Sequence, residues 1–149
     1  MYEILKFFHV MLVIIAVGFN ASYGIWFARV AKEPEHTGHV LRGVKFLDDR
    51  FANPAYALIL VTGFAMIIVG DVPMSQFWLL TSIVLFVAVA VVGLAVYTPI
   101  LRRQNELVAA NQVASSEYQA LAKRGAIVGG ILGALTVAIV FLMVTKPEL

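Results

Sequence analysis

The chain has 149 residues, of which 61% are hydrophobic and only 13% charged, and its formal net charge is +2 at pH 7. Soluble domains are closer to half apolar and a quarter charged, and a chain this short has too little interior for so much apolar surface, which excludes a soluble globular fold. The lack of cysteine excludes disulfides, zinc–thiolate sites and thiol nucleophiles, and the few basic residues form no nucleic-acid-binding patch.

Four apolar segments are long enough to cross a bilayer as helices, for which roughly 20 residues are needed. The centre of each segment contains no Asp, Glu, Lys or Arg. We therefore predict an all-α fold, a four-helix transmembrane bundle, in a single integral membrane domain over residues 1–149. Its spans are residues 7–27, 52–70, 77–100 and 126–144.

The first span carries polar residues on one face. At about 100° per residue, His9, Asn20 and Tyr23 fall within a narrow stripe. Polar side chains that face lipid are costly, so this stripe should point into the bundle. The apolar run exceeds the roughly 7–15 residues of a signal-peptide core, which favours a retained helix.

His9 admits two interpretations. It could be a haem or metal ligand or a proton relay, or it could be a polar contact with Thr81, Ser82 or water at one membrane surface. We favour the contact, because His36 and His39 lie across the membrane and cannot pair with His9 around a haem. His9 remains the candidate cofactor-binding residue, with haem as the cofactor. We predict no catalytic and no metal-binding residue.

The connection after the first span has helical character of its own. Val40, Val44, Leu47 and Phe51 recur at steps of four, three and four, and the charged residues lie largely elsewhere on the helical wheel. This pattern is typical of an amphipathic helix lying on the membrane surface, between the first and second spans.

Two tyrosines of the second and third spans, Tyr56 and Tyr97, fall in the same half of the membrane as Asn20 and Tyr23. These four residues are candidates for lining a polar cavity that would take a quinone headgroup or a small solute. The alternative, which we favour, is an aromatic belt at the interface with one interhelical hydrogen bond.

The third connection contains many good helix formers, so we predict that the third helix continues beyond the membrane to about Val113. Ser116 with Gln119 resembles a capping box that starts the fourth helix. The third and fourth helices should therefore share a cytoplasmic extension.

The fourth span has the clearest packing pattern. Gly125, Gly129 and Gly133 repeat every four residues, and Ala122 begins a neighbouring stripe of small residues. Such small-xxx-small faces let helix backbones approach closely. We favour packing within the bundle, and the alternatives are a dimer face or a flat ligand lying on the glycines.

The charges of the connections predict the orientation. Nine of the eleven Lys and Arg residues lie in the first and third connections. Basic loops stay on the cytoplasmic side, so both termini should face outside. We expect a multi-pass protein of a bacterial inner membrane.

The stretch KFFHVMLVIIAVGFNASYGIWFAR, residues 6–29, resembles an uncharacterised family of bacterial four-helix integral membrane proteins known only as a domain of unknown function. His9, Gly18 and the exit residue Arg29 are also similar to the first helix of CopD-type copper-resistance proteins and HemJ-type protoporphyrinogen oxidases. In those groups an early histidine is linked to copper or haem chemistry, which is what the resemblance implies for His9.

We predict a small polytopic membrane protein that serves as a structural or accessory subunit, and no residue pattern in the sequence identifies it as an enzyme. Its partners would be the lipid bilayer and either a second copy or a larger membrane complex. The first alternative is a haem- or quinone-binding redox protein centred on His9. The second is a small-solute transporter, which the lack of a carboxylate within the spans makes less favourable.

Overall fold

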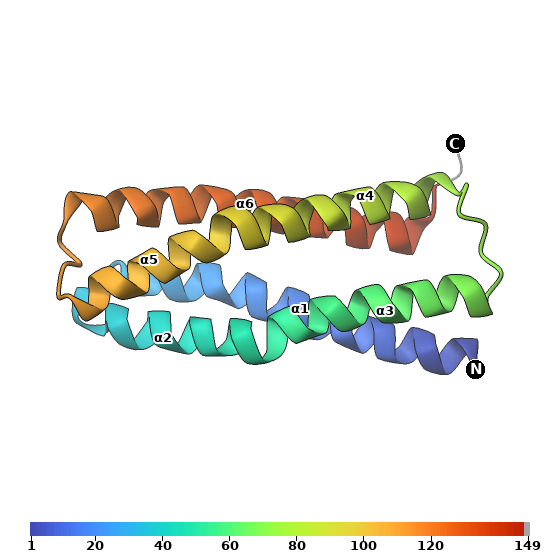
Figure 1. Cartoon of the computed structure of the whole chain (residues 1–149), viewed down its shortest axis with the longest axis horizontal. Coiled ribbons are helices and arrows are strands. Elements are labelled where there is room, and N and C mark those ends of the chain that lie inside the picture. The colour runs from blue at the N-terminus through green and yellow to red at the C-terminus, as the bar shows by residue number, and fades with distance from the viewer. Residues whose placement is uncertain (148–149) are drawn as a thin grey trace.

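The computed structural model describes residues 1–147, which form four long helical segments running along its longest axis (Figure 1). Each segment is long and apolar enough to cross a membrane. The predicted four-helix transmembrane fold is therefore confirmed. In chain order the elements are α1 (Tyr2–Val30), η1 (Pro34–His36), α2 (Thr37–Leu47), η2 (Asp48–Ala52), α3 (Asn53–Val69), α4 (Phe77–Val92), η3 (Gly93–Tyr97), α5 (Thr98–Ala109) and α6 (Ser116–Thr145).

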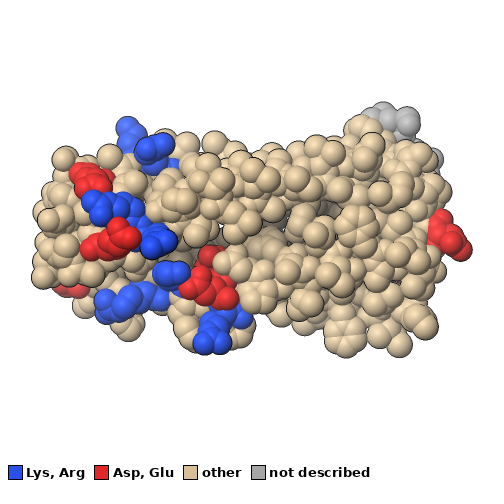
Figure 2. Space-filling model, in the orientation of Figure 1, with Lys and Arg blue, Asp and Glu red and all other residues tan. Residues whose placement is uncertain are grey.

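The bundle is longer than a bilayer is thick. The continuous helical segment Pro34–Val69 has 36 residues, or about 54 Å at ~1.5 Å per residue, against ~30 Å of hydrocarbon. The excess lies at the end formed by α2, α5 and the start of α6, where Lys and Arg gather (Figure 2). We call this the basic end. The N-terminus and the last turn of α6 lie at the opposite end, which we call the far end (Figure 1).

Both middle helices contain a π-helical turn that ends just before an X–Pro pair. η2 precedes Asn53-Pro54, and η3 precedes Thr98-Pro99. Proline lacks an N–H and its ring crowds the carbonyl four residues earlier, so the helix widens locally and bends. The Thr98 hydroxyl donates to the carbonyl of Gly93 at 3.1 Å. Beyond the bends, α2 and α5 pack against each other at the basic end.

The four helices form two pairs, α1 with α3 and α4 with α6. Within the described residues, α3 and α4 do not pack together along their lengths, although they are consecutive in the chain. The pairs meet at two clusters. The mid-membrane cluster consists of Ala16, Ala55 and Ile59, with Phe86 of α4 packed against it. The cluster at the basic end consists of Leu41, Leu101, Leu107 and Tyr118.

Large apolar side chains cover the outside of the bundle. Ile68 is 75% exposed, Val137 65% and Val144 75%. In water, apolar surface on this scale would drive association or aggregation. In a bilayer it is the surface that faces the lipid chains.

The segment predicted as a surface-lying amphipathic helix is helical, but its flat orientation is not confirmed. α2 continues through η2 into α3 and runs along the bundle (Figure 1). Its apolar face, including the buried Leu41 and Val44, turns inward, and Leu41 packs in the cluster with α5 and α6. Protein therefore covers Leu41 and Val44, whereas Phe46 and Phe51 remain exposed.

The third helix ends at Ala109, earlier than the predicted Val113. Asn111 adopts a positive φ of 55°, a left-handed conformation that Asn tolerates better than most residues and that stops a helix.

The start of the fourth helix was predicted one residue too late. The N-cap of α6 is Ser115, whose hydroxyl oxygen accepts from the backbone N–H of Tyr118 at 3.1 Å. Ser116 is the first helical residue, and the Gln119 side chain donates to the carbonyl of Val113 at 3.4 Å. The cap therefore follows the usual Ser geometry without the reciprocal Gln bond of a capping box.

Candidate functional site

His9 joins α1 to α3. Its Nδ1 lies 2.8 Å from the hydroxyl oxygen of Thr62. That hydroxyl donates to the carbonyl of Leu58 at 2.7 Å, so it accepts from His9, and Nδ1 carries the proton. A Cβ at Gly63 would lie 3.3 Å from His9 Cε1, so the glycine lets the imidazole lie close to the α3 backbone.

The predicted partners of His9, Thr81 and Ser82, were wrong. His9 lies seven residues after the start of α1, and Thr62 lies seven residues before the end of α3. Because the two helices are antiparallel, these residues sit at the same depth. Ser82 is buried, and its hydroxyl has no hydrogen-bond partner within the described residues.

A second polar contact joins the same two helices deeper in the membrane. The Asn20 side-chain amide donates to the Tyr56 hydroxyl at 3.0 Å and to the carbonyl of Ala16 at 2.9 Å. The Tyr56 ring packs edge-on against Phe86 of α4, with ring centroids 6.2 Å apart. One hydrogen bond and one aromatic contact thus connect three helices.

Tyr23 is the most buried of the tyrosines at 2% exposure, and its hydroxyl has no hydrogen-bond partner in residues 1–147. The nearby carboxylate of Asp48 accepts from the Asn53 amide at 3.2 Å. Asp48 lies near enough to Tyr23, Tyr56 and Tyr97 for a charge on its carboxylate to reach all three hydroxyl groups. We call this group the inner polar cluster, and its members are Asn20, Tyr23, Asp48, Tyr56 and Tyr97.

Tyr97 packs against the stripe of glycines on α6. A Cβ at Gly129 would lie 3.5 Å from Tyr97 Cε2 and 3.8 Å from its hydroxyl oxygen, so the ring lies against the glycine. One turn earlier, a Cβ at Gly125 would lie 3.4 Å from Ile100 Cγ2. Ala122 packs against the cluster at the basic end. A Cβ at Gly133 would meet no atom of residues 1–147 within 4 Å, so within the described structure this glycine faces open space.

The structure thus brings Asn20, Tyr23, Tyr56 and Tyr97 to one region, as their depths suggested. The sequence reasoning missed Asp48, because it placed this residue on the polar face of a surface helix. The sequence feature that could have identified Asp48 is Asn53-Pro54. This pair indicates that the helix bends after Asp48 and does not end there. The cluster offers hydroxyl and amide donors and one carboxylate, a set that can hold a carbonyl or a water molecule.

Two surface hollows lie outside this cluster. One, of about 370 Å³, lies on α1 and is lined by Ile14, Ile15, Gly18, Phe19 and Ser22. The other lies at the basic end of α1 and is described below. Within residues 1–147, no three His, Asp or Glu side chains come close enough to hold a metal ion.

Comparison with known proteins finds no matching curated protein and no matching solved structure. The likeness of the first helix to CopD-type and HemJ-type proteins stays a prediction. One family model, described as a predicted integral membrane protein, matches residues 3–147, nearly the whole chain. Together with the four membrane-length helices, this match shows that the chain belongs to the DUF2269 family of predicted integral membrane proteins.

Proposed function

We propose that this membrane protein is a structural or accessory subunit, that it lies in a bacterial inner membrane, and that both of its termini face outside. The proposal rests on the contacts that the polar side chains make inside the membrane. His9 bonds to Thr62, and Asn20 bonds to Tyr56, so both pairs hold α1 against α3. Side chains that serve helix contacts in this way support a structural role over a cofactor role.

The surroundings of His9 support the same proposal. A haem ligand needs open space beside the imidazole for the flat macrocycle. One edge of the His9 ring is covered by the α3 backbone at Gly63, and Nδ1 is bonded to Thr62.

Photo-crosslinking in the membranes of the expressing cell tests the proposal. A photoreactive residue at Ile68 or Val137, which are 75% and 65% exposed, would report what covers the outer faces of α3 and α6. A control probe at Ala16, which is fully buried, reports only contacts within the chain. We expect a discrete protein adduct at one outer position, and its mass distinguishes a second copy from another subunit. Lipid adducts alone at both positions would contradict the proposal.

The inner polar cluster favours a second candidate function, the binding of a quinone headgroup. The Tyr23 hydroxyl is buried and has no hydrogen-bond partner among residues 1–147, and a quinone carbonyl could accept its hydrogen bond. Extraction of the purified protein and quinone analysis would test this function. Stoichiometric quinone that is lost in Tyr23→Phe but kept in the control Tyr118→Phe would favour the second candidate over the first.

A further inference from the structure

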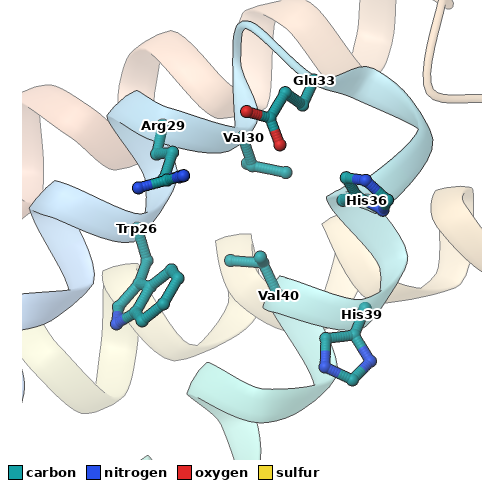
Figure 3. A pocket seen from close by; sticks show the side chains of 7 residues that line it. All are labelled: Trp26, Arg29, Val30, Glu33, His36, His39 and Val40. Carbon is teal, nitrogen blue, oxygen red and sulfur yellow. The ribbon is translucent and has the colours of Figure 1, made fainter.

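A hollow of about 180 Å³ opens at the basic end, between the last turn of α1 and the first turn of α2. Figure 3 shows five polar or aromatic side chains around it, with Val30 and Val40 between them. The five come from α1, the connection and α2, and they are Trp26, Arg29, Glu33, His36 and His39.

The hollow lies at the level where lipid headgroups begin. Trp26 and Arg29 stand where the apolar residues of α1 give way to the charged connection. Tryptophan and arginine at such a boundary mark the membrane interface. Trp26 is 49% exposed, so its ring is available to a lipid. The molecules next to this hollow in a membrane are therefore phospholipids.

The wall of the hollow is largely apolar, and side chains of both charge signs stand around it without being paired. Neither Arg29 nor Glu33 forms a salt bridge in the described part of the chain, where five ion pairs are found elsewhere. Each imidazole of His36 and His39 adds at least one N–H donor. A guanidinium and two imidazoles suit a phosphate, and a carboxylate suits a primary ammonium.

We propose that this hollow binds the headgroup of a phospholipid that carries a phosphate and a primary amine, as phosphoethanolamine does. Arg29, His36 and His39 donate hydrogen bonds to the phosphate, and Glu33 accepts from the ammonium group. Trp26 lies at the side that faces the glycerol backbone and the acyl chains. At roughly 30 Å³ per water molecule, the hollow holds about six waters, which leaves room for the phosphate and the ammonium group.

The arrangement predicts a ranking of lipids. A choline headgroup has the phosphate but no N–H to donate to Glu33. A glycerol headgroup has no cation, so its phosphate stands uncompensated beside the Glu33 carboxylate. Phosphatidylethanolamine should therefore bind more tightly than phosphatidylcholine or phosphatidylglycerol with the same acyl chains.

Native mass spectrometry of the full chain tests this ranking with the three lipids supplied in equal amounts. We expect ethanolamine-lipid adducts to exceed each of the others about threefold to fivefold, the effect of one partly exposed ion pair. Glu33→Gln should remove this preference, and Arg29→Gln should weaken the binding of all three lipids. The matched control is Lys32→Gln, which loses the same charge beside the hollow without lining it.

Several results would overturn the proposal. Equal retention of the three lipids by the wild type, or dominance of phosphatidylglycerol, would exclude the paired-charge site. Equal effects of Arg29→Gln and Lys32→Gln would mean that basic residues attract the lipids in general, without a specific site. Soluble glycerophosphoethanolamine should not displace the bound lipid at equal concentration. Complete displacement would instead assign the hollow to a soluble phosphate ester.

Discussion

Replacing Gly129 by Leu should force α6 away from the π-helical turn η3. A Cβ at this position would already lie 3.5 Å from Tyr97 Cε2, an ordinary van der Waals contact. Each further carbon adds about 1.5 Å of reach, so a Leu Cγ directed at the ring would overlap it. A helix allows Leu only two common χ1 rotamers, so the ring or the helix must move. Overpacking of this kind costs about 1–3 kcal/mol.

The matched control is Gly133→Leu, one turn further along the same stripe. A Cβ there meets no atom of residues 1–147 within 4 Å, so we expect the free energy of unfolding to change little. Gly129→Ala should also be tolerated, because its single methyl group makes an ordinary contact. SDS titration in mixed micelles, followed by tryptophan fluorescence, measures the three variants against the wild type. The packing account fails if Gly129→Leu keeps the wild-type midpoint, or if Gly133→Leu shifts the midpoint equally.

Three further predictions use the same kind of measurement or a simple labelling assay. Tyr56→Phe removes the acceptor of the Asn20 amide and should lower the free energy of unfolding by about 0.6–1.7 kcal/mol; an unchanged value would mean that the bond adds nothing. Ser82→Ala removes a buried hydroxyl that has no partner in the described residues, so stability should stay equal or rise, and a clear loss would reveal a partner. For the orientation, a cysteine introduced at Gln76 should react with an impermeant thiol reagent on intact cells and one at Gln112 should not, and the reverse pattern would invert the topology.

The sequence was sufficient to predict the spans, because a bilayer imposes both a length and an apolar composition on every crossing helix. It also predicted which face of α1 turns inward. Tyr23, on the predicted polar stripe, is 2% exposed, and Asn20 bonds across to α3. Helical periodicity fixes the relative directions of side chains on one helix, so these features follow from local geometry.

The pairing of helices was not predictable in the same way. Hydropathy does not say which helix packs against which, so the partner of His9 was sought on α4 and found on α3, at Thr62. The period of the glycine stripe likewise predicts a continuous contact face, yet within the described structure Gly133 faces open space. Spacing along a single helix carries no information about where its neighbours lie.

Absorption spectroscopy of the purified protein, with His9→Gln beside the wild type, tests the structural role of His9 most directly. The role assigned here predicts no Soret band in either protein. It also predicts that His9→Gln folds and loses at most about 1–2 kcal/mol of unfolding free energy, since Gln can replace much of the hydrogen bond to Thr62. A Soret band in the wild type that vanishes in His9→Gln would contradict it, and would make His9 a haem ligand.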